Sequence, residues 1–313
     1  MAKLRKINGK IITTIKLLVS IGLLIILLYQ LFRFDKFAPE EILLRKPSLL
    51  FLAFLLMPIN WLIEGIKWRI ILKSLHAKVS LSKVVFSLLT GVSSSLFTPN
   101  RSGNFIGRMI WLPKRLQIEA SVLTIYGNVA QWIASMFFGA IGFALFVHLD
   151  FPEIAGWMWV IFYLLTTIMV VLYLRPMVVP RFISRFFWKK SMEHAALVLQ
   201  RNHQLKWQLL GLSLLRHSIF SIQYVLILSA FTIPVNLELL YAVWTVYFLM
   251  TLAPSIAFGK LLVRENIAVF VLAGLIPNSA VILSCSLILW FINLSLPALL
   301  GGIIWLRWKP SKS

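Results

Sequence analysis

The chain has 313 residues, of which 60% are hydrophobic and 13% are charged, and its formal net charge is +21 at pH 7. Soluble domains have about 45 to 50% apolar and about 25% charged residues, so this composition excludes a soluble globule and predicts an integral membrane protein. The basic excess gathers in clusters between apolar runs, which is typical of membrane topology, and we expect no nucleic-acid partner.

The first apolar run, 11–32, follows a basic N-terminal stretch and predicts a retained transmembrane helix. It is too long for a signal peptide and no small-residue cleavage site follows it. A second helix is predicted at 48–66, and five Lys and Arg residues follow it between 67 and 83. Because cytoplasmic loops collect Lys and Arg, the N-terminus and 67–83 are predicted to be cytoplasmic.

The next segment, 84–112, is predicted to enter the membrane and return to the same side as a re-entrant hairpin. It contains a break at 98–101, and its two pieces are too short for two full spans. A helix at 120–147 then leads outward to the acidic loop 148–155. The alternative for the hairpin, a plain span followed by an ordinary loop, would require the basic clusters to disagree with the topology.

The second half continues the same alternation of sides. Helix 156–174 returns inward, and the basic segment 178–206 predicts an interfacial linker helix, which could equally be only a topology anchor. Helix 207–231 goes outward, and 278–306 ends at basic residues inside. The segment 238–276 is therefore predicted to enter and leave from the outside.

One motif occurs twice, at Pro99–Arg108 and at Pro254–Glu265, where Pro, Gly and Arg interrupt apolar sequence. The offset is 156 residues both for its glycine (259 − 103) and for its arginine (264 − 108), about half of the chain. Duplicated helix breaks are typical of transporters built from inverted repeats. We assign the first half-repeat to about 11–174 and the second to about 207–307.

These patterns predict an all-α, polytopic membrane protein with about six to eight transmembrane helices and two re-entrant hairpins in an inverted-topology repeat. The whole chain, 1–313, is expected to form a single membrane domain. We expect it in the cell membrane, the inner membrane where there are two, with both termini in the cytoplasm.

The arginines beside the two breaks, Arg101, Arg108 and Arg264, are the predicted ligands of a lipid phosphate. A charge at the centre of a membrane costs about 2.5 to 3.5 kcal/mol, so its presence needs a reason. Arginine offers a fork of donors that suits phosphate. The half-helices that begin at Gly103 and Gly259 would direct unpaired amides at the same point.

Four more residues are candidates for a cavity-lining or coupling role: Glu64, Arg216, His217 and Glu265. A surface ion pair with Lys67 explains Glu64 more simply than proton coupling does, and Arg216 could reach the cytoplasm by snorkelling. Glu265 directly follows an arginine and could pair with it. The arginines would then act as structural pins, which is the alternative to phosphate binding.

Signatures of an enzyme are missing from the sequence. There are ten acidic residues in all, no His pair at metal-ligand spacing and no phosphate-binding glycine loop. The single cysteine, Cys285, lies in an apolar run and is expected to fill space in the core. We therefore expect no enzyme activity, no cofactor and no metal.

Three stretches, Trp61–Arg69, Thr98–Arg108 and Pro254–Glu265, resemble the membrane region of lysylphosphatidylglycerol synthases and of their stand-alone flippase-like relatives. The similarity covers nearly the whole chain. It implies a region that moves lipids between leaflets, whereas aminoacylation in that family belongs to a separate soluble domain, which we do not expect within these residues.

Asn104 and Lys260 follow the two motif glycines where the family has Glu, and Leu262 replaces a further glycine. The missing acids make the site more positive, which favours an anionic headgroup over a cationic aminoacyl lipid. We predict a flippase-like transporter of an anionic phospholipid or a polyprenyl-phosphate-linked lipid. The alternatives are an intramembrane lipid-modifying transferase, with Glu64 or Glu265 as its acid or base, and a non-transporting membrane partner of a separate lipid synthase.

Overall fold

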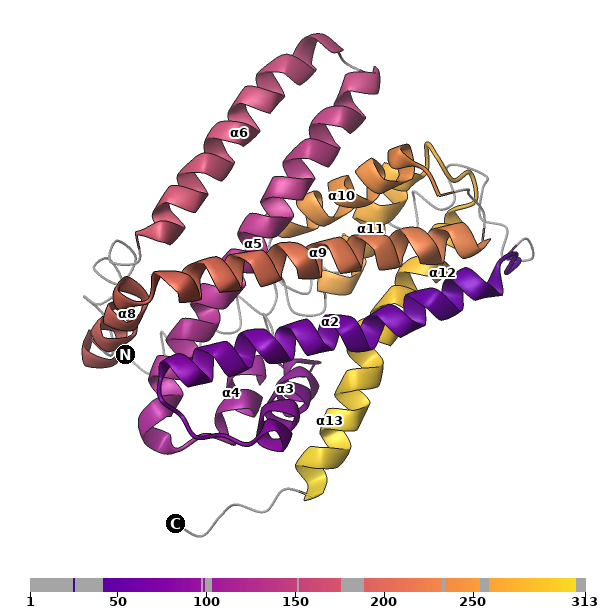
Figure 1. The fold of residues 1–313 in the computed structure, drawn as a ribbon. Coiled ribbons are helices and arrows are strands. Elements are labelled where there is room, and N and C mark those ends of the chain that lie inside the picture. The colour runs from indigo at the N-terminus through magenta and orange to yellow at the C-terminus, as the bar shows by residue number, and fades with distance from the viewer. Residues whose placement is uncertain are drawn as a thin grey trace, which may run out of the picture.

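A computed structural model shows an assembly of α-helices in which α2 and α9 run side by side across the middle (Figure 1). The structure describes residue 25 and residues 42–96, 98, 103–150, 152–175, 189–231, 235–253 and 259–307. No strand occurs in these residues, which confirms the all-α prediction. The helices are α2 (Pro47–Ser74), α3 (Leu81–Leu96), α4 (Gly103–Met109), α5 (Lys114–Asp150), α6 (Pro152–Leu174), α8 (Lys189–Arg201), α9 (His203–Phe231), α10 (Leu237–Leu252), α11 (Gly259–Leu272), α12 (Ser279–Trp290), the π-helical turn η3 (Phe291–Ser295) and α13 (Leu296–Arg307).

Four helical stretches in the described part of the chain are long and apolar enough to cross a membrane: Pro47–Ser74, Lys114–Leu145, His203–Phe231 and Ser279–Leu306. The last of them joins α12, η3 and α13. Shorter apolar helices occur in α6 and α10. The chain is thus an integral membrane protein. Apart from residue 25, which is helical, the predicted first helix at 11–32 lies outside the described residues, so the prediction of six to eight spans stays a prediction.

The helix ends follow from local chemistry. Pro47 begins α2, where a missing amide hydrogen costs nothing because the first turn has no partner for it. The Asn236 side chain caps α10 by accepting a hydrogen bond from the Leu239 amide at 2.8 Å, and Asn278 caps α12 in the same way. These caps fix the starts of α10 and α12, close to where the sequence predicts that new segments begin.

The central helices α2 and α9 are antiparallel. The backbone amide of Arg45, just before α2, donates to the carbonyl of Ala230 at the end of α9, at 2.9 Å. Near the opposite end of the pair, the Lys67 ammonium donates to the Ser213 hydroxyl at 2.8 Å. Residue numbers therefore rise along α2 as they fall along α9.

The segment predicted as the first hairpin forms two helices, α3 and α4, that pack against each other. The Thr90 hydroxyl donates to the Gly107 carbonyl at 2.7 Å, and the Ser94 hydroxyl donates to the Gly103 carbonyl at 2.6 Å. A Cβ atom at Gly107 would overlap the Thr90 carbonyl oxygen and the Ser94 hydroxyl. Glycine at this position therefore permits the close approach of the two backbones.

The helix bounds repeat at the offset found in the motif. α2 and α9 begin 156 residues apart (203 − 47), α3 and α10 both begin and end 156 residues apart (237 − 81 and 252 − 96), and so do the starts of α4 and α11 (259 − 103). The packing partners exchange in the same way, since α10 lies against α5 and α3 lies against α13. The order α2, α3, α4, α5 thus recurs as α9, α10, α11, α12–α13.

We expect Gly107→Ala to destabilise the protein, because the new methyl group would force the backbones of α3 and α4 apart. Overpacking of this kind costs about 1 to 3 kcal/mol, which should appear as a lower denaturation temperature of the detergent-solubilised protein. Gly211→Ala is the matched control, since a Cβ atom there meets nothing within 4 Å. Equal denaturation temperatures for the two variants would contradict the close packing.

Candidate functional site

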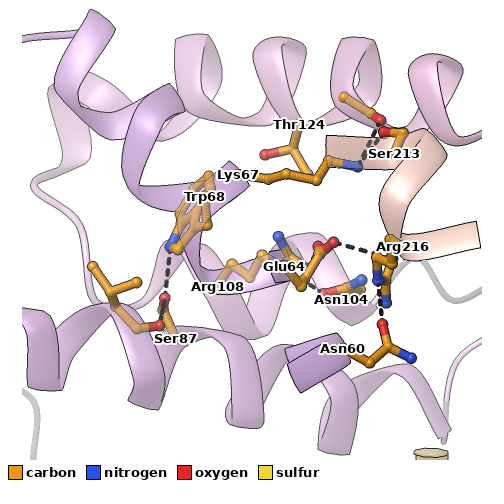
Figure 2. A network of polar contacts seen from close by, with 12 residues as sticks. Asn60, Glu64, Lys67, Trp68, Ser87, Asn104, Arg108, Thr124, Ser213 and Arg216 are labelled. Carbon is orange, nitrogen blue, oxygen red and sulfur yellow. Dashed lines mark hydrogen bonds and ion pairs between the residues drawn. The ribbon is translucent and has the colours of Figure 1, made fainter. Parts of the chain in front are cut away.

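A cluster of buried charged side chains lies where α2, α4 and α9 meet (Figure 2). At its centre, Glu64 Oε1 accepts a hydrogen bond from Arg108 Nη2 at 2.6 Å, and Glu64 Oε2 lies 3.1 Å from Arg216 Nη1. Only 8% of Glu64 and 4% of Arg108 are exposed. One carboxylate therefore joins three helices, two from the first half of the chain and one from the second.

The polar face of α2 explains why these groups meet. Asn60, Glu64 and Lys67 follow the i, i+4, i+7 spacing of one helix face, and all three are buried. Polar side chains on an otherwise apolar span face the protein interior, because lipid offers them no partner. This face is turned towards α9 and α4.

Arg108 is held along its whole length. Its Nε donates to the Asn104 side-chain oxygen one turn earlier at 2.8 Å, and its guanidinium carbon lies 5.5 Å from the centre of the Trp68 ring. Trp68 is itself fixed by a hydrogen bond to the Ser87 hydroxyl at 2.7 Å. The guanidinium thus has one acidic partner, one amide partner and one aromatic face.

Arg216 connects the cluster to the C-terminal helices. Its Nε donates to the Asn60 side-chain oxygen at 2.8 Å. The Asn60 amide donates to Asn293 at 3.3 Å, and Asn293 donates to Gln223 at 2.7 Å. Asn293 lies in η3, and π-helical turns of this kind are frequent at functional sites.

Lys67 is the third cation, and it has no acidic partner within ion-pair distance among the described residues. Its ammonium donates to the Ser213 hydroxyl and, at 3.3 Å, to the Gly127 carbonyl, both of which are uncharged. Only 4% of Lys67 is exposed. Lys67, Arg108 and Arg216 therefore surround the single carboxylate of Glu64, which leaves an excess of two positive charges (three minus one).

A small cavity of about 10 Å³ adjoins this cluster, which is room for about one water molecule. Two of the three cations, Lys67 and Arg108, line it together with apolar groups. The lining residues are Glu64, Lys67, Trp68, Ile71, Arg108, Thr124, Gly127 and Asn128.

The second motif arginine, Arg264, pairs differently. Its guanidinium donates to the carboxylate of Glu265, the next residue on α11, and 4% of Glu265 is exposed. α4 packs on α3 and α5, whereas α11 packs on α10 and α12. The structure thus places Arg108 and Arg264 in separate polar clusters, and the ion pair of Glu265 with its neighbouring arginine agrees with the pairing considered for structural pins.

The remaining predicted residues have different outcomes. Arg101 lies outside the described residues. Gly103 and Gly259 begin α4 and α11, as the break pattern predicts for the two half-helices. His217 is buried away from the cluster, with its Nδ1 3.2 Å from the Ser135 hydroxyl and its ring stacked on Phe138.

Two sequence interpretations are wrong. Glu64 does not form a surface ion pair with Lys67, because it is buried and pairs with arginines of α4 and α9. Arg216 does not reach outward by snorkelling, because that same carboxylate and Asn60 hold it inside. Sequence reasoning also missed Lys67 and Asn60 as site residues, although their spacing to Glu64 on one helix face was a usable signal.

The cluster is suited to binding an anion. Arginine forks that hold a carboxylate can hold a phosphate with the same geometry. Both predicted acid–base candidates, Glu64 and Glu265, are engaged by arginines. Within the described ranges no group of three His, Cys, Asp or Glu side chains could hold a metal ion.

We expect Glu64→Gln to destabilise the protein strongly, because two buried guanidinium groups would lose their counter-charge. Removing one partner of a buried ion pair costs about 3 to 5 kcal/mol. The measurement is the denaturation temperature in detergent, with Glu193→Gln, an exposed position on α8, as the control. A double variant with Arg108→Gln should lose less than the sum of its parts, and strict additivity would show that the pair does not interact.

The comparisons with known proteins identify the family of the chain. The family model described as the lysylphosphatidylglycerol synthase TM region matches residues 14–301. No curated protein and no solved structure matches the chain. The matched range includes every residue of the cluster and both copies of the motif. The chain therefore belongs to the family of the lysylphosphatidylglycerol synthase TM region.

Proposed function

We propose that the protein is a flippase-like transporter that moves an anionic lipid, either a phospholipid or a polyprenyl-phosphate-linked lipid, between leaflets. One observation carries the proposal: three buried cations lie around one carboxylate where α2, α4 and α9 meet. The family is consistent with lipid handling. An excess of buried positive charge selects a negatively charged headgroup over a neutral or cationic one.

The net charge of the buried cluster favours an anionic ligand over a neutral or cationic one. A buried ion is costly unless it is paired, and Lys67 has only uncharged partners. A phosphodiester would supply one negative charge and a phosphomonoester up to two, against the excess of two. Lys67 and the arginine forks would hold its oxygens, and the headgroup would compete with Glu64 for Arg108 and Arg216.

We propose that the two halves form an inverted-topology repeat. The corresponding helices α2 and α9 are antiparallel, as a two-fold axis in the membrane plane requires. Asn60 and Arg216 occupy corresponding positions (216 − 60 = 156) and are hydrogen-bonded to each other. They mark the place where such an axis would pass, at the edge of the charged cluster.

The two halves of the proposed repeat differ in their charged residues. The position that corresponds to Glu64 is Phe220 (220 − 64 = 156), so Arg264 has no equivalent carboxylate on α9. It pairs instead with Glu265, whose counterpart is Met109. Arg108 thus pairs with Glu64 of its own half, and Glu64 in turn binds Arg216 of the second half, whereas Arg264 pairs with its neighbour on α11. Rocking of the halves would change these pairings.

The transferase alternative has less support. Such an enzyme needs a carboxylate free to exchange a proton, but Glu64 is held by two arginines and Glu265 by one. Glu64 stabilises the buried cluster in the transporter proposal, and no chemistry is required of it. The non-transporting alternative predicts no lipid movement, so a transport measurement also tests it.

We expect Lys67→Gln and Arg108→Gln to slow leaflet exchange of a fluorescent phosphatidylglycerol in proteoliposomes. Each loses one charge-assisted hydrogen bond, worth about 1.5 to 3 kcal/mol, so the rate should fall roughly tenfold to a hundredfold. Arg201→Gln, exposed at the end of α8, should leave the rate unchanged. A labelled polyprenyl phosphate, assayed in parallel, identifies which anionic lipid is preferred.

Equal exchange in vesicles with and without the wild-type protein, for both lipids, would refute the transport proposal. Unchanged rates in both variants would refute the headgroup site while leaving transport intact. The effect of Arg264→Gln, measured alongside, reports whether the second-half arginine contributes as the repeat predicts.

The inverted topology predicts that corresponding loops lie on opposite sides of the membrane. Ser80→Cys before α3 and Val235→Cys before α10 place single thiols at exposed positions in a Cys285→Ala background. An impermeant maleimide should label the first only from the cytoplasmic side and the second only from the outside. Labelling of both from one side would exclude an inverted repeat.

A further inference from the structure

A second, separate pocket of about 400 Å³ lies at the C-terminal end of α2. Four basic or imidazole side chains line it together with apolar ones. The lining residues are Arg69, Leu72, Lys73, His76, Ala77, Lys78, Val79 and Val84. The central cluster shares none of these residues, because it occupies another face of α2.

The turn after α2 shapes this pocket. His76 has φ of 52°, in the left-handed region, and its amide donates to the Lys73 carbonyl at 3.0 Å. The Ala77 amide donates to the Leu72 carbonyl, also at 3.0 Å, which completes a Schellman motif. This turn reverses the chain towards α3 and brings Lys78 back beside the last turn of α2.

An apolar stripe leads into the pocket along α2. Ile59, Leu62 and Ile66 are exposed, with 62% of Leu62 uncovered, and they continue at helical spacing into Arg69 and Lys73. The apolar part of α2 before Lys67 is about 20 residues long, or about 30 Å at 1.5 Å per residue, close to the thickness of the hydrocarbon core. Arg69 and Lys73 therefore lie at the depth of lipid headgroups.

The charges around the pocket are unbalanced. In the described part of the chain, none of the ion pairs involves Arg69, Lys73 or Lys78. The segment before α2 that lies outside the described residues carries both signs of charge, with four Lys and Arg among the first ten residues and Asp35, Glu40 and Glu41 nearer to α2. Among the described residues no acid balances the pocket, so an anionic ligand would suit it.

We propose that this pocket binds the phosphate headgroup of an anionic phospholipid whose acyl chains lie along Ile59, Leu62 and Ile66. The basic side chains supply the charge that recognises the headgroup, and the apolar stripe excludes a soluble phosphate as the preferred ligand. The site is independent of the transport proposal, since it lies on a different face of α2. It serves as a place where an anionic lipid is held at the edge of the helix assembly.

The test is binding of a fluorescent-chain phosphatidylglycerol to the detergent-solubilised full chain, followed by fluorescence anisotropy. Each basic residue near a lipid headgroup contributes about fivefold in affinity, so Arg69→Gln with Lys73→Gln should weaken binding roughly 30-fold. Arg175→Gln with Arg201→Gln removes two exposed charges elsewhere and should change the affinity less than about twofold. The phosphatidylcholine analogue should bind the wild-type chain weakly.

The measurement is repeated in a Lys67→Gln background, so that binding at the central cluster is reduced and the loss from Arg69 and Lys73 must persist. Equal weakening by the two double variants would overturn the proposal, because general surface charge would then explain binding. Equal affinity for phosphatidylcholine, or displacement by inorganic phosphate at the concentration of the lipid, would also overturn it. None of these outcomes depends on whether the protein transports lipid.

Discussion

Glu64 binds two arginines, one with each oxygen of its carboxylate, and the charged interior depends on this pair of contacts. It joins α2 to α4 through Arg108 and to α9 through Arg216, and so connects the two halves of the chain. Within the membrane, each of these guanidinium groups would be too costly without a partner. The same carboxylate cannot satisfy Lys67 as well, whose partners are uncharged. The fold thus pairs two cations with an acid, whereas the third has uncharged partners only.

Much of the architecture follows from local sequence, because helix breaks and apolar runs act over short distances. The 156-residue offset of the motif reappears in the starts of α3 and α10 and of α4 and α11. The sequence predicts a lipid phosphate, or alternatively a buried acid, as the partner of Arg108, and Lys67 as the partner of Glu64. In the structure Arg108 pairs with Glu64, which lies 44 positions away in sequence. The packing of α4 on this face of α2 cannot be read from residue spacing.

The asymmetry between the halves has a physical consequence. A symmetric inverted repeat would hold both motif arginines equally, and its two conformations would have equal energy. Here Glu64 on α2 supports the arginine of α4 within the first half, and Phe220 stands at the corresponding position in the second half. The conformation seen in this structure is therefore stabilised by the Glu64–Arg108 ion pair of the first half. An anionic headgroup that draws Arg108 away from Glu64 would weaken this stabilisation.

The basic residues at the end of α2 divide into two groups that need different explanations. Arg69 and Lys73 are exposed near the C-terminal end of an apolar helix long enough to cross a membrane, where Lys and Arg are common even before any lipid binds. Lys67 lies two positions before Arg69 but is buried against α9, where no topology rule applies. A charge kept out of both water and headgroups, with no acid paired to it, is retained at a cost to stability. That cost is consistent with a functional role. The cavity beside Lys67 has room for about one water molecule, so an anion that pairs with Lys67 would have to displace the present contacts of the cluster.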